Sequence, residues 1–232
     1  MKTAVIIPAG GSGTRIGGTL PKQYRKVAGV EILAYTLGIF NKCSQVNEIV
    51  VAVSEEYKNI PAKLAQKYGF SKPIKVVSGG KERQHSVHNA LRSLSMKNGD
   101  LIIVHDSVRP LLPPEILKKA LKTAKEKGTA VVATGVRDTI IKATNSFLEY
   151  PERKHLLSIQ TPQIFRYEII NEAFRFLGDS GFIATDESML VYNSGYEINF
   201  VEGSPLNFKI TTSEDITLMK EIILGRRGRN DR

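Results

Sequence analysis

Short runs of apolar residues alternate along the chain with longer stretches whose apolar residues lie three and four positions apart. The short runs are typical of buried strands, and the spaced stretches are typical of amphipathic helices. The predicted strands span residues 5–7, 49–53, 74–77, 101–104 and 130–133. The predicted helices span residues 31–40, 82–94, 115–127 and 167–177. This order predicts a Rossmann-like α/β fold, with a mostly parallel twisted sheet and helices on both of its faces.

Residues 136–160 break the alternation. Residues 139–142 and 147–150 have the character of strands, and a polar turn at 144–146 separates them. A hairpin with so little core of its own is marginally stable alone. We therefore expect a protruding β-arm that packs on a second subunit and makes the protein a homodimer. Residues 1–224 are expected to form a single domain with this arm inserted, and residues 225–232 a disordered basic tail.

Composition narrows the possible locations and partners. Cys43 is the only cysteine of the 232 residues, so no intrachain disulfide can form, and no apolar run approaches the ~20 residues of a membrane span. The first residues also lack the pattern of a signal peptide. We expect a cytoplasmic protein without a membrane partner.

The net charge of +10 suits a phosphate-rich ligand and equally suits nucleic acid. The aromatic content of only 7%, the absence of tryptophan and the lack of an RNA-recognition motif argue against a nucleic-acid partner.

A glycine-rich loop, PAGGSGTRIG, begins at Pro8 directly after the first predicted strand. Glycines such as Gly10 and Gly11 let the backbone approach a ligand, and the N–H groups of such a loop can hold phosphate oxygens. The loop matches neither the dinucleotide template nor the P-loop template. Its alternative interpretation is a plain strand-to-helix turn. Arg15 and Lys22 favour the phosphate site, because two cations can neutralise the charge that grows on a triphosphate during transfer.

Asp106 follows the predicted strand at 101–104, where a carboxylate can reach a Mg²⁺ ion that also binds phosphates, or can cap a turn. His105 is a candidate general base, although a structural hydrogen bond is the commoner role for such a histidine. Arg109 can hold a substrate phosphate or form a surface ion pair.

Two further segments offer weaker signals. Gly80, Lys81 and Ser86 lie where a strand runs into a helix, and they can contact a base or ribose or simply begin the helix. Lys209 lies on a strand that runs into a helix near Ser213, and taken alone it is an ordinary exposed lysine.

Seven motifs occur in the order in which the 2-C-methyl-D-erythritol 4-phosphate cytidylyltransferases carry them. They are PKQY at 21–24, GG-ER-SV at 79–87, HD-RP at 105–110, VRDT at 136–139, QTPQ-F at 160–165, TDE at 185–187 and EG-FKIT at 202–211. The chain resembles this family from about residue 3 to about residue 224.

The resemblance implies an enzyme that joins CTP to 2-C-methyl-D-erythritol 4-phosphate with Mg²⁺ or another divalent ion. Arg15 and Lys22 match the pair that stabilises the five-coordinate α-phosphate, and Arg153 and Lys209 match the pair that positions the polyol phosphate. The positions that match CTP contacts are Pro8, Ala9, Gly10, Gly11, Gly80, Lys81, Ser86 and Asp106. The positions that match acceptor contacts are Asp106, Arg109, Thr139, Arg153, Thr185 and Lys209. Asp106 also matches the metal ligand.

In the family, the arm reaches into the partner's active site. The resemblance therefore implies that Thr139 and Arg153 act across an obligate homodimer.

The chain departs from the family at two places. It carries Gly10 where the family usually has a second alanine, and Leu206 where an acidic residue is common. The first departure, together with Val108, is similar to the ribitol 5-phosphate cytidylyltransferases. The sequence therefore leaves ribitol 5-phosphate open as an alternative acceptor, while VRDT and ERQHSV favour methylerythritol phosphate.

Overall fold

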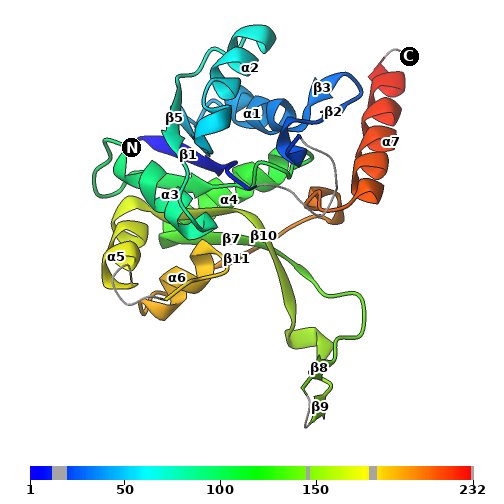
Figure 1. The fold of residues 1–232 in the computed structure, drawn as a ribbon. Helices are drawn as coiled ribbons and strands as arrows, with labels where there is room; N and C mark the ends of the chain where they lie inside the picture. The colour runs from blue at the N-terminus through cyan, green and yellow to red at the C-terminus, as the bar shows by residue number, and fades with distance from the viewer. Residues whose placement is uncertain (12–19, 145–146, 178–181, 231–232) are drawn as a thin grey trace.

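The computed structural model describes residues 1–11, 20–144, 147–177 and 182–230, the last four of these by their backbone alone (Figure 1). Arg15, one of the two cations predicted to flank the glycine loop, lies outside the described residues.

A seven-stranded sheet in the order β11-β7-β10-β6-β1-β4-β5 forms the centre of the molecule. Its strands are β1 (Thr3–Pro8), β4 (Glu48–Val53), β5 (Ile74–Ser78), β6 (Leu101–Val104), β7 (Thr129–Gly135), β10 (Leu157–Arg166) and β11 (Phe200–Glu202). The five predicted strands are all present. β10 pairs antiparallel with β6 and β7, and the other pairings in this sheet are parallel, so the mostly parallel arrangement is confirmed.

Helices cover both faces of the sheet, as predicted. They are α1 (Ile32–Lys42), α2 (Ile60–Tyr68), α3 (Arg83–Arg92), α4 (Pro114–Lys127), α5 (Tyr167–Leu177), α6 (Glu187–Asn193) and α7 (Ser213–Asn230). The alternation of side chains along β1 divides the core: Val5 and Ile7 pack with α1 and α4, whereas Ala4 and Ile6 pack with α3, α5 and α6. The sequence did not predict α2 or α6 as helices, whereas the helix expected near Ser213 is present as α7. None of the described helices combines the length and apolar composition of a membrane span.

Shorter elements connect these layers. A small hairpin, β2 (Lys26–Val27) with β3 (Val30–Glu31), precedes α1, and single turns of 3₁₀ helix occur at Lys22–Tyr24, Glu55–Tyr57, Arg153–His155 and Pro205–Asn207. A third apolar cluster joins α7 to the residues after β6, with Val108, Ile210 and Met219 buried in it. It holds the segment that carries Lys209 close to the end of β6.

The predicted arm is a hairpin that projects from the body of the molecule (Figure 1). Its strands are only β8 (Lys142–Ala143) and β9 (Leu148–Glu149), and residues 145–146 of its turn lie outside the described residues. Leu148 and Tyr150 are each 65% exposed, so the arm buries little of its own apolar surface. Its C-terminal boundary was placed too late, because residues 157–160 belong to β10.

The tail prediction also needs correction. The backbone of residues 225–230 continues α7 to Asn230, whereas the sequence analysis expected disorder from residue 225.

Candidate active site

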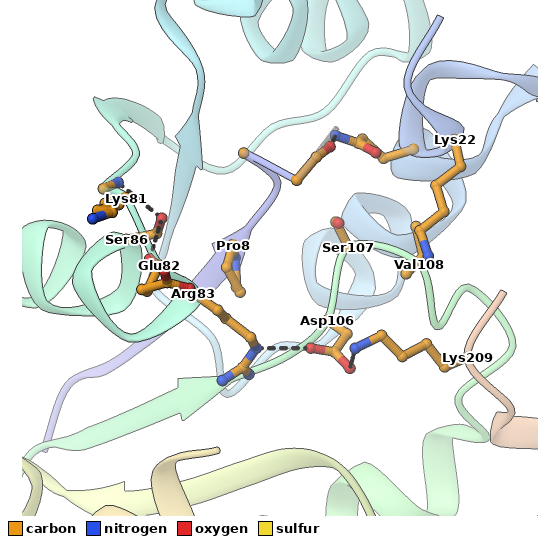
Figure 2. A pocket seen from close by; sticks show the side chains of 14 residues that line it. Pro8, Lys22, Lys81, Glu82, Arg83, Ser86, Asp106, Ser107, Val108 and Lys209 are labelled. Atoms are coloured by element: carbon orange, nitrogen blue, oxygen red, sulfur yellow. Dashed lines mark hydrogen bonds and ion pairs between the residues drawn. The ribbon is translucent and has the colours of Figure 1, made fainter. Parts of the chain in front are cut away.

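A cavity of about 340 Å³ opens beyond the carboxyl ends of β1 and β6, where ligands bind in sheets of this kind. Figure 2 shows that side chains from several separate segments point towards it. Its walls consist of Pro8, Gly10, Gly11, Lys22, Gln23, Gly80, Lys81, Glu82, Arg83, Ser86, Asp106, Ser107, Val108 and Lys209. Eight predicted site residues therefore line one cavity together with Lys22, and their roles in catalysis remain predictions. The remaining predicted CTP contact, Ala9, does not line the cavity and is buried at the start of the loop.

The described start of the glycine loop, as far as Gly11, is held in place by a buried glutamine. Gln23 donates from Nε2 to the carbonyl oxygens of Ala9 and Gly11, at 2.7 and 2.9 Å. The Ser54 hydroxyl donates to the carbonyl oxygen of Gly10 at 3.1 Å. Three successive carbonyls thus have fixed partners, which sets the backbone of residues 9–11 before any ligand arrives.

The turn before α3 faces this loop across the cavity. The Gly80 N–H donates to Ser86 Oγ at 2.9 Å, and Ser86 Oγ donates to the carbonyl oxygen of Glu82 at 3.2 Å. A Cβ on Gly80 would lie 2.3 Å from the Cβ of His85, so only glycine fits this turn. Ser86 therefore shapes the turn, and Lys81 stands exposed at its edge.

Asp106 is the centre of an ion-pair network. Its Oδ1 lies 3.2 Å from Nε of Arg83, and its Oδ2 lies 3.2 Å from both Nε of Arg109 and Nζ of Lys209 (Figure 2 draws the pairs with Arg83 and Lys209). Arg83 extends the network through Nη1, which lies 2.8 Å from both carboxylate oxygens of Glu187. Burial alone would raise the pKa of Asp106, but Arg83, Lys209 and Arg109 together hold that pKa well below its usual range.

The surroundings of Asp106 fit the role of a Mg²⁺ ligand. Among the described residues, no three His, Cys, Asp or Glu side chains gather into a metal cluster. One carboxylate is sufficient for Mg²⁺ when phosphate oxygens and water supply the other ligands. The donor set therefore fits an ion that binds together with a triphosphate, and such an ion has to compete with Lys209 for the carboxylate.

His105 has the structural role rather than that of a general base. Its Nε2 lies 3.0 Å from the carbonyl oxygen of Arg109, which can only accept, so this nitrogen carries the proton. Its Nδ1 accepts from the hydroxyl of Thr161 at 3.1 Å, and that hydroxyl also accepts the N–H of Asp106. Burial lowers the pKa of His105 to about 4. Both ring nitrogens are occupied, and the ring orients the backbone at Asp106.

Lys22 and Lys209 approach the cavity from distant parts of the sequence. Lys22 donates from Nζ to the carbonyl oxygen of Ile210 at 2.8 Å, beside the segment that carries Lys209. The exposed-lysine interpretation of Lys209 is therefore wrong, because its ammonium group is paired with the buried Asp106.

A second cavity of about 150 Å³ lies on the other side of Asp106 and shares Arg83, Asp106 and Lys209 with the first. Besides Asp106 and Lys209, it is lined by two further predicted acceptor contacts, Arg109 and Thr185. Arg109 is 9% exposed and also donates from Nη1 to the carbonyl oxygen of Asn207 at 2.8 Å, so it is no surface ion pair.

The remaining predicted acceptor contacts, Thr139 and Arg153, are not brought to either cavity. Both are exposed on the arm, and Arg153 donates from Nη1 to the carbonyl oxygen of Arg137 at 2.8 Å. Arg153 lines a separate open hollow at the base of the arm. Within one chain, the arm and the cavities are therefore distinct.

Sequence reasoning missed three residues that organise the site: Gln23, Arg83 and Glu187. Each lies inside a recognised motif, in PKQY, GG-ER-SV and TDE respectively. The motifs indicated that these positions matter, but no spacing indicated that Arg83 bridges Asp106 and Glu187.

A Rossmann-like sheet with two glycine turns and several cations around one cavity defines a nucleotidyltransferase. The family model of 2-C-methyl-D-erythritol 4-phosphate cytidylyltransferase matches residues 3–226. The chain belongs to this family.

Relatives match over nearly the whole chain. The 2-C-methyl-D-erythritol 4-phosphate cytidylyltransferase of Clostridioides difficile is 40% identical over 222 residues, which are 95% of this chain and 93% of the relative. That of Caldanaerobacter subterraneus is 38% identical over 221 residues, or 94% and 97% of the two chains. Among solved structures, the 4-diphosphocytidyl-2C-methyl-D-erythritol synthase of Anaerococcus prevotii has a TM-score of 0.84 at 27% identity, with 96% of each chain covered.

Proposed function

We propose that the protein transfers CMP from CTP to 2-C-methyl-D-erythritol 4-phosphate, releasing pyrophosphate, as a step of isoprenoid precursor biosynthesis. The observation that carries the proposal is the convergence of Lys22, Lys209 and the Asp106 network on one cavity between two glycine turns. Family membership supplies the identity of the two substrates.

The reaction is an in-line displacement. An oxygen of the acceptor phosphate attacks the α-phosphorus of CTP, the bond from that phosphorus to the β-bridging oxygen breaks, and pyrophosphate leaves with the electron pair. A phosphate monoester has a second pKa of about 6, so its attacking oxygen is already ionised at neutral pH. The step needs no general base, which agrees with the structural role of His105.

Catalysis then rests on positioning and on charge stabilisation. Lys22, with Arg15 as its proposed companion, stabilises the negative charge that grows around the five-coordinate α-phosphorus. Lys209 holds the acceptor phosphate beside it. The turns at Gly10–Gly11 and Gly80 hold the nucleotide, with Lys81 and Ser86 at the second turn.

Asp106 is proposed to bind Mg²⁺ together with the triphosphate. With Mg²⁺ or another divalent ion held there, the site would gain a positive charge that could neutralise phosphate charge and orient the triphosphate.

We further infer a homodimer in which the arm brings Thr139 and Arg153 to the acceptor phosphate in the partner's site. The exposed apolar residues of the arm support this inference. An arginine suits the task, because its planar guanidinium can hold two phosphate oxygens at once. A cytoplasmic location is proposed as well, since CTP is an intracellular nucleotide.

The test is pyrophosphate release by the purified protein with CTP and each of two acceptors. Turnover is expected with 2-C-methyl-D-erythritol 4-phosphate and to be far slower with ribitol 5-phosphate. The other nucleoside triphosphates in place of CTP serve as controls for the nucleotide. Faster turnover with ribitol 5-phosphate, or none with either acceptor, contradicts the proposal.

A further inference from the structure

The small cavity behind Asp106 contains a buried hydrogen-bond donor without a partner. Gln163 lies on β10, its side chain is fully buried, and it lines this cavity. Among the residues that the structure describes, nothing accepts a hydrogen bond from its Nε2. A buried donor without a partner is destabilising, because it has lost its hydrogen bonds to water, so its presence in a core strand calls for an explanation.

The orientation of the Gln163 amide follows from its other contact. The backbone N–H of Ser188, in the first turn of α6, donates to Gln163 Oε1 at 2.8 Å. A backbone N–H can only donate, so the atom that it meets has to be the oxygen. The amide therefore cannot be flipped to satisfy Nε2, which stays unpaired in a residue that lines the cavity.

The wall of this cavity includes a second residue with a buried donor that lacks a partner. Nη2 of Arg83 is buried and, within the described part of the chain, has no hydrogen-bond partner, although Nε and Nη1 of this residue pair with Asp106 and Glu187. The cavity also contains acceptors, namely the carboxylates of Asp106 and Asp186. Residues that carry donors and residues that carry acceptors thus line one small cavity.

The combination of hydrogen-bond donors and acceptors indicates which kind of ligand fits the cavity. A phosphate can only accept at neutral pH and would be repelled by the two carboxylates, while the positive charges of Arg83 and Arg109 are already neutralised by Asp106 and Glu187. A hydroxyl group both donates and accepts. A small polyol chain is therefore the ligand that satisfies such a cavity, with its phosphate left near Lys209.

We propose that Gln163 is a specificity-determining residue that donates from Nε2 to a hydroxyl oxygen of the polyol acceptor. The inference rests on the proposed function and deepens it, because it assigns the recognition of a hydroxyl group to a residue of the buried sheet. A site built to bind a hydroxyl group discriminates strongly against an analogue that lacks it, since the buried donor is then left unpaired.

The experiment compares the wild type with one variant on the acceptor and on a set of acceptor analogues. Gln163→Met keeps the length of the side chain and removes the donor. Kinetics are measured with 2-C-methyl-D-erythritol 4-phosphate and with analogues that each lack one hydroxyl group. For the full acceptor, the variant should lose kcat/KM by roughly 10- to 100-fold, while the KM for CTP changes by no more than about twofold. The wild type should discriminate against one deoxy analogue, and the variant should lose that discrimination.

Gln84 offers a matched control outside the site. It is also a buried glutamine, its Oε1 accepts the N–H of Ala184, and its Nε2 donates to the carbonyl oxygen of Phe182. Gln84→Met is expected to lower thermal stability and to leave discrimination among acceptors unchanged. If Gln163→Met does not fold, Gln163→Glu retains an acceptor for Ser188 and is measured at pH 8 instead.

The outcomes separate this inference from the proposed function. A wild type that turns over none of the polyol phosphates refutes the proposed function. A wild type that is active, with a Gln163 variant that discriminates among the analogues as the wild type does, refutes the role of Gln163 alone. That second result would indicate that the donor of Gln163 is satisfied by a buried water molecule.

Discussion

Asp106 illustrates how strongly a single residue depends on its partners. Taking a carboxylate out of water costs several kcal/mol, and here three cations repay the cost. The same pairs fix the positions of Arg83 and Lys209, so the carboxylate organises the site even before a ligand binds. A substitution at Asp106 therefore acts on the fold and on the chemistry together, and an experiment has to separate the two.

The first prediction separates the effect on the fold from the effect on the chemistry by measuring how activity depends on Mg²⁺. Asp106→Asn preserves the shape of the side chain but removes its charge, so the concentration of Mg²⁺ that gives half-maximal activity should rise sharply. Activity is measured across a Mg²⁺ titration at saturating substrates.

Asp100 offers a control for this titration, because it is also a buried aspartate and accepts the backbone N–H groups of Lys2 and Lys97, away from the cavity. Asp100→Asn should lower stability and leave the titration unchanged. An unchanged curve for Asp106→Asn would remove Asp106 from the metal site.

The second prediction concerns charge that develops only during the reaction. Lys22 is proposed to stabilise the five-coordinate α-phosphorus, and the loss of one such preorganised donor lowers kcat by roughly 10²–10³. Lys22→Ala should show this loss with KM values that change much less. Lys26→Ala is the control, since Lys26 is exposed and forms only a loose ion pair of 3.9 Å with Glu31. Near-normal kcat in Lys22→Ala would contradict the assignment.

Among the elements, the turn before α3 restricts most strongly which residue can occupy one of its positions. A methyl group on Gly80 would meet the Cβ of His85 at 2.3 Å and its carbonyl carbon at 2.9 Å, neither of which belongs to a flexible side-chain end. Gly80→Ala should therefore displace the turn, at a cost of about 1–3 kcal/mol, and raise the KM for CTP by roughly tenfold or more.

Gly225→Ala provides the comparison for this third prediction, because Gly225 lies in α7 and, apart from its own helix backbone and chain neighbours, no described atom lies within 4 Å of the added carbon. It should leave all kinetic constants unchanged. Equal KM values for CTP in the two variants would show that the turn at Gly80 tolerates a side chain and does not position the nucleotide.

The elements also show which structures a sequence reveals. β1, β4, β6 and β7 were predicted because each is an apolar run, and a strand buried on both faces needs such residues, while the edge strand β5 was predicted from the apolar residues beside Lys75. β10 was missed because its buried positions include Gln160, Thr161 and Gln163, which hydrogen bonds rather than apolar character make tolerable. The stretch 157–160, in which polar Ser158 and Gln160 alternate with apolar residues, therefore resembled part of the arm.

The same limit applies to the site. Glycine turns and the cations beside them are visible in the sequence, because the residue types carry the chemistry. Pairings such as Arg83 with Asp106 and Glu187 depend on which loops meet at the sheet edge, and no local pattern contains that information. The seven motifs identified the right segments, and the structure was needed to identify the contacts.

On the scale of the whole molecule, the site of one chain lacks part of its proposed machinery. Arg153 lies on the projecting arm and lines neither cavity, whereas Lys22 and Lys209 line the same cavity of their own chain. The exposed apolar side chains of the arm include Ile140, Ile141 and Phe147. A dimer that buries these side chains would also carry Arg153 to the site of the partner.

The fourth prediction tests this arrangement by mixing two inactive variants. Chains with Arg153→Ala and chains with Lys22→Ala are combined in equal amounts and allowed to exchange subunits. If Arg153 serves the partner's site, each mixed dimer has one site with both side chains intact. Mixed dimers form half of the population, so about a quarter of the wild-type activity should return.

A second mixture, Lys22→Ala with Lys209→Ala, distinguishes shared sites from other forms of rescue. Both lysines line one cavity of a single chain, so every site in a mixed dimer lacks one of them, and activity should stay at the level of the separate variants. Exchange is verified by mass spectrometry of differently tagged chains. If exchange is complete and the first mixture is as inactive as the second, Arg153 serves its own chain. The arm would then have to fold back towards the cavity that it avoids in this structure.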